Sequence, residues 1–209
     1  MPNQYQLSFP LPSYHFLHLS ATWIYWTLMV LAKQKDTQRR LYEEIVKYSS
    51  STGPITLDDI EKMPYFNAFL REVLRLYPPV GQFFRYNAHD EVFGGYKIPR
   101  DTKLFISPHL LHRNPKYWKD PLEFRPERWL EKDKTKHHPF SFIPFSAGGR
   151  NCAGQQFAQL EAQLIVSSLI RSFHIDIAPE QAGIEFQFAA YITMKSRPDL
   201  KIIVRNRKE

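Results

Sequence analysis

The chain has 209 residues, of which 43% are hydrophobic, and a formal net charge of +7. This length and composition allow a buried core, which excludes a disordered or fibrous protein and favours one domain or a large part of one. The single cysteine, Cys152, excludes an intramolecular disulfide framework and any zinc site that needs two thiolates. No nucleic-acid-binding motif accompanies the positive charge, so we expect no nucleic-acid partner.

Residues 1–32 contain no Lys, Arg, Asp or Glu, and residues 16–32 form an apolar run that is followed by Lys33. The run is close to the length of a membrane-spanning helix, so a signal anchor is one interpretation. His15, His18 and the lack of a basic segment before the run argue against an anchor. We favour a fully buried helix, because such a helix has the same hydropathy in a large helical protein.

From Asp36 the pattern becomes that of an amphipathic helix, which ends at the serine-rich stretch 49–54. Leu41, Ile45 and Val46 are assigned to the inward face of this helix.

A second helical region begins near Thr56, breaks at Pro64 and then continues to Pro78. Its apolar positions follow helical spacing: Phe66, Phe69, Leu70, Val73 and Leu74. Glu72 and Arg75 are three residues apart on this helix, so their side chains can meet. Spacing alone favours a surface ion pair, because a buried pair would need further hydrogen bonds, for example from Arg128.

Short strands are predicted next, in the segments 82–87, 91–99 with a Gly94–Gly95 turn, and 102–107. Residues 112–132 are predicted to form an ordered irregular loop. After Cys152 a long helix is expected, with these residues on its buried face: Phe157, Leu160, Leu164, Val166, Leu169 and Ile170. The alternating segments 184–195 and 200–206 predict sheet. These elements together predict a mainly α fold with small β-sheets (α+β).

Cys152 lies in a glycine-rich loop directly before the last predicted helix. The helix macrodipole and free backbone N–H groups favour a thiolate there, and Arg150 adds positive charge. Gly148 and Gly154 leave room for a flat group near the backbone, and Phe145 can shield the sulfur from water. These features suit an axial thiolate to haem iron, with Arg150 pairing to a propionate. A buried cysteine in a glycine loop fits the same residues equally well.

The stretch FSAGGRNCAG around Cys152 resembles the cysteine-ligand motif of the cytochrome P-450 haem-thiolate monooxygenases. Glu72-Val-Leu-Arg75 resembles that family's Glu-x-x-Arg helix. FRPERW resembles its meander segment, in which Arg128 would complete a Glu-Arg-Arg network. The resemblance thus favours a buried ion pair over a surface one. Arg85 matches the position of a haem-propionate arginine.

The resemblance covers about residues 20–205 and implies the C-terminal part of the cytochrome P-450 fold, with the N-terminal half missing. Residues 1–15 resemble nothing in the family, so the domain portion is assigned to residues 16–209. The acid–threonine pair that manages protons in the family falls at His18 and Leu19, and leucine cannot donate a hydrogen bond. No catalytic residue is therefore assigned, and we expect weak or no activity from this chain alone.

The resemblance implies a monooxygenase that inserts one oxygen atom of O₂ into a lipophilic substrate such as a sterol, fatty acid or xenobiotic. The implied cofactor is haem b, with NADPH acting indirectly through a flavoprotein reductase. Five lysines could form a basic face that binds this reductase: Lys116, Lys119, Lys132, Lys134 and Lys136. A run of solvated charges on the surface fits the same residues equally well. The likeness to microsomal members implies membrane association on the cytoplasmic face of the endoplasmic reticulum. A non-catalytic haem-binding or interaction remnant is the alternative function.

Overall fold

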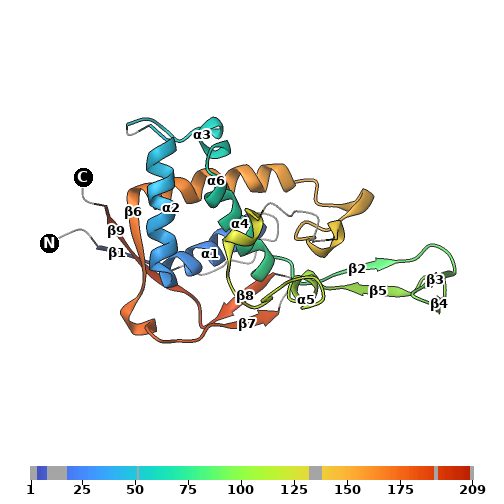
Figure 1. The fold of residues 1–209 in the computed structure, drawn as a ribbon. Helices are drawn as coiled ribbons and strands as arrows, with labels where there is room; N and C mark the ends of the chain where they lie inside the picture. Colours follow the sequence, from blue (N-terminus) through green and yellow to red (C-terminus); the bar gives the residue numbers. More distant parts are fainter. Residues whose placement is uncertain (1–3, 9–17, 51, 132–137, 191–192, 208–209) are drawn as a thin grey trace.

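Four long helices surround the core: α1 (His18–Lys33), α2 (Lys35–Tyr48), α4 (Pro64–Leu76) and α6 (Gln155–Ser172). The structure is a computed structural model that describes residues 4–8, 18–50, 52–131, 138–190 and 193–207. In Figure 1, α1 lies at the centre, and α2, α4 and α6 pack against it. The predicted fold class, mainly helical with small β-sheets, is confirmed over these residues.

The apolar run near the N-terminus forms α1, and this helix is buried in the protein. The side chains of Trp26 and Leu31 are 1% and 0% exposed. The prediction of a buried helix is thus confirmed for most of α1 from Thr22 to Ala32, whereas Leu19 and Ala21 in its first turn are exposed. Across the described residues, no helix has both the length and the apolar character needed to cross a membrane.

α2 is amphipathic, and it buries Gln38, Leu41 and Ile45. The prediction that Val46 shares this face is wrong, because its side chain is 48% exposed. Position 46 lies about 140° around the helix from position 41, which points it away from the core.

The helical region before Pro78 starts and breaks where the sequence predicts. α3 (Leu57–Glu61) begins with a capping box, in which the Thr56 side chain accepts from the Asp59 N–H and the Asp59 side chain accepts from the Thr56 N–H. α4 begins with Pro64 in its first turn, where a helix needs no N–H donor. All five predicted apolar positions of α4 are buried: Phe66, Phe69, Leu70, Val73 and Leu74.

The two described ends of the chain meet in one antiparallel sheet. Its strand order is β1 (Gln4–Ser8), β9 (Lys201–Asn206) and β6 (Phe173–Ile177). The register joins Gln4 to Arg205 and Ile177 to Ile202. The strand predicted at residues 200–206 is confirmed, whereas β1 and β6 were not predicted.

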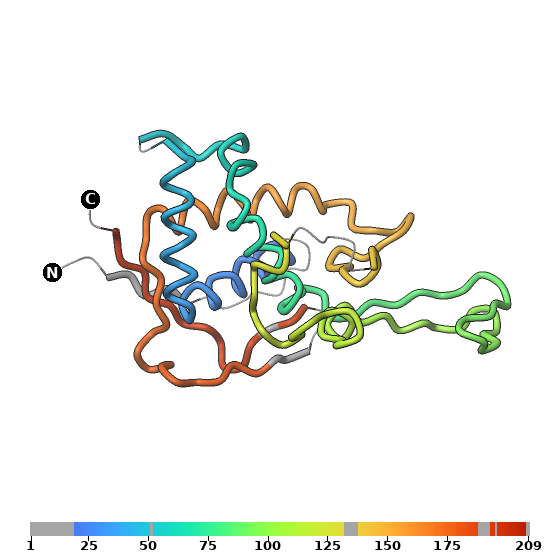
Figure 2. The backbone as a smooth tube through the Cα atoms, in the orientation of Figure 1, coloured from blue at the N-terminus to red at the C-terminus, as the bar shows by residue number. Residues whose placement is uncertain are grey.

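Two linked hairpins extend away from the helices (Figures 1 and 2). β2 (Phe83–Tyr86) pairs with β5 (Lys103–Ile106), and β3 (Glu91–Phe93) pairs with β4 (Tyr96–Ile98). Gly94 and Gly95 form the turn with φ values of 57° and 88°, which favour glycine. Another hairpin joins β7 (Gln187–Ala190) to β8 (Met194–Arg197). These strands lie in segments that the sequence predicts as strands, except that β8 continues two residues beyond the predicted segment 184–195.

α6 follows Cys152, as predicted, but its apolar residues occupy two faces instead of one. Ala162, Val166 and Ile170 are 0% exposed, whereas Phe157 is 70% and Leu160 is 40% exposed. The prediction that Phe157 and Leu160 are buried is therefore wrong. Both positions lie roughly opposite position 162 on the helix, because each residue turns the helix by about 100°.

Candidate functional site

A tight loop holds Cys152 just before α6. The Cys152 N–H donates to the Phe145 carbonyl oxygen at 2.9 Å, and the Ser146 N–H donates to the Ile143 carbonyl oxygen at 3.1 Å. Ser146 has a φ of 66° and Gly148 a φ of 78°, both in the left-handed region. Gly148 meets this backbone demand without strain, whereas Ser146 does not.

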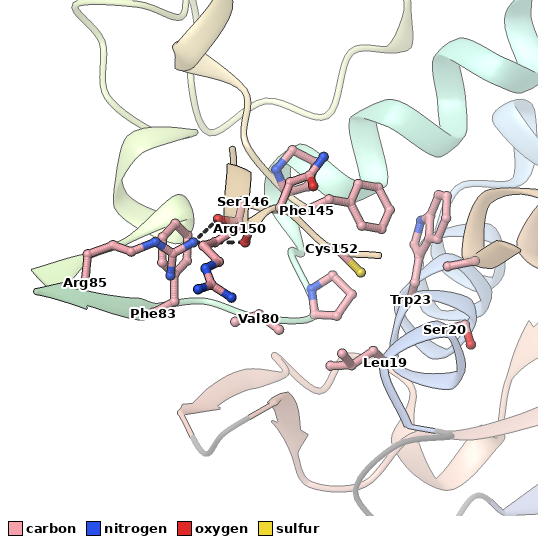
Figure 3. A pocket seen from close by; sticks show the side chains of 14 residues that line it. Leu19, Ser20, Trp23, Val80, Phe83, Arg85, Phe145, Ser146, Arg150 and Cys152 are labelled. Atoms are coloured by element: carbon pink, nitrogen blue, oxygen red, sulfur yellow. Dashed lines mark hydrogen bonds between the residues drawn. The ribbon is translucent and has the colours of Figure 1, made fainter. Parts of the chain in front are cut away.

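Cys152 contributes to the wall of a cavity of about 240 Å³ (Figure 3). The thiol is half-buried, and the Gly154 position brings no side chain beside it; a Cβ there would lie 4.0 Å from Sγ. Most of the surrounding wall is apolar: Trp23, Pro79, Val80, Phe83, Pro144, Phe145 and Ala158. Burial of a flat apolar ligand against this wall would be favourable.

Two arginines line the same cavity, Arg85 from β2 and Arg150 from the cysteine loop (Figure 3). Arg85 Nη2 donates to Ser146 Oγ at 2.7 Å and to the Arg150 carbonyl oxygen at 3.2 Å. The Arg150 guanidinium has no hydrogen-bond or ion-pair partner among the described residues. An anionic group on a ligand would therefore meet positive charge at this part of the cavity.

The wall opposite Cys152 comes from the first turns of α1 (Figure 3). Leu19 lines it and is 38% exposed. Ser20, which the sequence analysis did not select, brings a hydroxyl to the same wall. Phe145 lies between the two walls, and its ring makes an edge contact with Trp23 at a centroid distance of 6.2 Å.

Glu72, Arg75 and Arg128 form a buried network, with their side chains 0%, 0% and 2% exposed. Glu72 Oε1 accepts from Arg75 Nη2 at 2.8 Å and from Arg128 Nε at 2.9 Å. Glu72 Oε2 accepts from Arg75 Nε and Trp129 Nε1, both at 2.9 Å. Both carboxylate oxygens are thus satisfied, which is what makes a buried charge tolerable.

The two guanidiniums also hold the irregular segment between α5 (Pro108–Leu111) and the cysteine loop. Arg75 donates to backbone carbonyl oxygens of residues 112, 121 and 123. Arg128, in the short 3₁₀ helix Pro126–Trp129, donates to those of residues 119, 120 and 123. The segment is therefore ordered by hydrogen bonds to two side chains, in the irregular form that the sequence predicts.

The residues around Cys152 fit a haem group. They bring together one cysteine sulfur, apolar walls and two cationic side chains, the groups that would hold the iron, the macrocycle and the carboxylates of a haem. Trp23 is 3% exposed, and its Nε1 has no acceptor among the described residues, which leaves a buried donor for a ligand or water. Within that part of the chain, no three His, Cys, Asp or Glu side chains gather as a metal site.

The proposed basic face is described only in part. Lys116 and Lys119 are exposed, whereas Lys132, Lys134 and Lys136 lie outside the described residues.

Besides Ser20, sequence reasoning missed two side chains that the structure brings to these regions, Trp23 at the cavity and His112 beside the cysteine loop. Trp23 faces the cavity, and Trp129 donates to Glu72. Trp129 belongs to the FRPERW motif that the sequence analysis selected, but its hydrogen bond to Glu72 was not predicted.

Comparison with known proteins supports the motif-based interpretation. A family model for cytochrome P450 matches residues 19–202. Cytochrome P450 4V2 of Mus musculus is 35% identical over 191 residues, which are 91% of this chain and 36% of the mouse protein. The Homo sapiens protein of that name is 36% identical over 171 residues, 80% of this chain and 33% of its own length.

A more distant relative gives the same picture. Probable cytochrome P450 4ac1 of Drosophila melanogaster is 30% identical over 188 residues, which are 90% of this chain and 36% of the fly protein. The chain therefore spans about a third of the length of the curated relatives that it matches.

Proposed function

The chain belongs to the cytochrome P450 family, and on that premise we propose that it is the haem-binding part of a monooxygenase. The proposed reaction inserts one oxygen atom of O₂ into a lipophilic substrate, with sterols, fatty acids and xenobiotics as the candidate classes. We assign this function to residues 16–209, the C-terminal portion of the domain. Haem, when bound, supplies the oxygen-activating redox chemistry that amino-acid side chains lack.

One observation carries the proposal: the only cysteine of the chain lies in the wall of an apolar cavity that two arginines also line. Cys152 is proposed as the axial ligand of the haem iron. Arg85 and Arg150 would each pair with a haem carboxylate, because a guanidinium binds a carboxylate through two parallel hydrogen bonds.

The remaining residues of the loop would keep the ligand in place. Phe145 accepts the Cys152 N–H through its carbonyl oxygen, and its ring covers one side of the cavity. Gly148 permits the left-handed turn, and Gly154 leaves the space beside the sulfur free of a side chain. Together they would exclude water from the sulfur and fix its direction.

The wall formed by α1 is poorly equipped to deliver protons. Leu19 has no proton to donate, and Ser20 offers one hydroxyl beside it. The partly exposed Leu19 leaves this side of the cavity accessible to water. We therefore propose slow and poorly coupled turnover by these 209 residues alone, with reducing equivalents lost to peroxide.

Electrons are proposed to come from NADPH through a flavoprotein reductase. Lys116 and Lys119 are exposed and would attract an acidic partner surface. We also propose membrane association at the cytoplasmic face of the endoplasmic reticulum. The only support for this proposal is the likeness to the cytochrome P450 family.

The test begins with a titration of the purified chain with haem, followed by NADPH, a microsomal reductase and a panel of fatty acids and sterols. We expect saturable uptake of one haem per chain and product formation far below NADPH consumption. Cys152→Ser should weaken haem uptake, while Ser50→Ala, a matched change on an exposed loop, should not.

Haem uptake that is absent in the wild-type chain, or equal in Cys152→Ser, would refute the proposal. Uptake without product from any substrate would instead support the non-catalytic haem-binding remnant.

A further inference from the structure

His112 connects the buried ion network to the loop that carries Cys152. It caps the C-terminus of α5, and its side chain is 0% exposed. Its carbonyl oxygen accepts from Arg75 Nη1 at 2.8 Å. Its ring nitrogen Nε2 accepts from the Ile143 N–H at 2.9 Å, and the ring packs on Phe142 at a centroid distance of 5.1 Å.

The loop continues this connection to the thiol. The Ile143 carbonyl oxygen accepts from the Ser146 N–H, and the Phe145 carbonyl oxygen accepts from the Cys152 N–H. The path from Glu72 to Cys152 therefore runs through Arg75, His112 and the backbone of residues 143–152. Within this path, the imidazole supplies the contact between α5 and the cysteine loop.

The imidazole is held in one protonation state. Because a backbone N–H donates to Nε2, the neutral ring carries its proton on Nδ1. Burial lowers the pKa of His112 to about 3, which keeps the ring neutral at physiological pH. The ring is thus a permanent acceptor for the Ile143 N–H.

We propose that His112 is a positioning residue for Cys152. Through its two hydrogen bonds, His112 fixes the position of the loop that carries the thiol relative to the Glu72–Arg75 pair. Its relevance to haem ligation rests on the proposed function, whereas the contact itself involves only protein groups.

Filling space does not account for this histidine. Nδ1 is buried and has no acceptor among the described residues, and an unsatisfied buried donor destabilises a protein. An apolar side chain of similar size would avoid that penalty and still pack on Phe142. What an apolar side chain cannot do is accept the Ile143 N–H.

A pair of variants separates these two roles. His112→Gln keeps an acceptor near the position of Nε2, and His112→Met has a similar length without a comparable acceptor. His109→Met is the matched control, because His109 lies on the same short helix and its Nδ1 contacts Arg113 instead of the loop.

The first readout is the alkylation rate of Cys152 in the haem-free chain, which reports on this loop alone because the chain has one cysteine. We expect His112→Met to react roughly tenfold faster than wild type, as the loss of one buried hydrogen bond favours local opening. His112→Gln and His109→Met should react at close to the wild-type rate. The second readout is the fraction of thiolate-ligated haem in the reduced, carbon monoxide-bound chain, which should fall only in His112→Met.

Alkylation of His112→Met within twofold of wild type would overturn the inference. If His112→Met does not fold, amide hydrogen exchange at Ile143 decides: protection in wild type and His112→Gln supports the inference, and a fast-exchanging Ile143 amide in the folded wild type overturns it. If the wild-type chain takes up no haem while the alkylation rates differ as expected, the proposed function fails and the positioning role stands.

Discussion

The ion network around Glu72 and the cavity around Cys152 differ in how completely the chain satisfies its own polar groups. In the network, both oxygens of Glu72 accept hydrogen bonds, and Arg75 and Arg128 also donate to surrounding carbonyl oxygens. In the cavity, the buried Trp23 Nε1 has no hydrogen-bond partner among the described residues, and the exposed Arg150 brings a second donor group. The network is thus complete within this chain, whereas the cavity has the donors and apolar surface that a ligand would use.

The largest effect on stability is expected when the ion network around Glu72 is broken. Glu72→Gln removes the negative charge between two buried guanidiniums and should lower the free energy of unfolding by about 3–5 kcal/mol. Denaturant titration measures this change. Asp36→Asn, in an exposed ion pair with Arg39, is the control and should change stability by less than about 0.5 kcal/mol. Equal effects in the two variants would show that the network contributes no more than a surface pair.

Lowering the pH is expected to destabilise the same region through His112. Its folded-state pKa is lowered from 6.5 to about 3, so between these values the unfolded chain binds a proton that the folded chain does not. Stability should therefore decrease as pH falls, by up to about 1.4 kcal/mol per pH unit for one proton.

The comparison of wild type with His112→Gln isolates this histidine, because His109, whose pKa is lowered to about 4, titrates in both proteins. We expect the stability difference between the two proteins to shift in favour of His112→Gln as pH falls below 6.5. A difference independent of pH would contradict the buried, neutral state of the ring.

In the cavity, Arg85→Gln should affect ligand binding more than folding. Arg85 contacts Ser146 Oγ and the Arg150 carbonyl oxygen, and glutamine loses its positive charge. Haem affinity should fall about tenfold, which corresponds to about 1.4 kcal/mol. A haem titration of the variant beside Arg100→Gln, which alters an exposed arginine on the projecting hairpins, gives the comparison. Unchanged affinity in Arg85→Gln would remove this residue from the proposed site.

The smallest effect on stability is expected for Phe157→Ser, on the exposed face of α6. Phe157 is 70% exposed, so the change in the free energy of unfolding should stay below about 0.5 kcal/mol. Ile170→Val, on the buried face of the same helix, should lower stability by about 0.5–1.5 kcal/mol although it removes only one methylene group. Thermal unfolding of the two variants side by side checks the order, and a larger loss for Phe157→Ser would mean that this face is covered.

Local patterns were sufficient for much of the fold. Helical spacing identified the buried face of α4, and the Gly94–Gly95 turn identified the β3–β4 hairpin. Periodicity failed where apolar residues occupy two faces: Phe157 and Leu160 look like core positions until the packing of Ala162 is known. β1 was not predictable because its stability comes from pairing with β9, almost two hundred residues away.

The candidate site was predictable to a similar extent. Cys152 and the glycines around it are adjacent in sequence, so the loop could be recognised directly. The burial of Glu72 and Arg75 depends on Arg128 and on carbonyl oxygens from a distant segment, and their spacing alone favoured a surface pair. His112 left no signal, because its role depends on a contact with Ile143, which is 31 residues away.

The central claim is that Cys152 is the sulfur ligand of a haem in this cavity. The most direct test is the absorption spectrum of the haem-loaded chain after reduction and addition of carbon monoxide. The account predicts the red-shifted Soret band of thiolate-ligated haem in the wild-type chain and its loss in Cys152→Ser, since the chain has no other cysteine. The same band in Cys152→Ser, or its absence from a wild-type chain that has bound haem, would contradict the account.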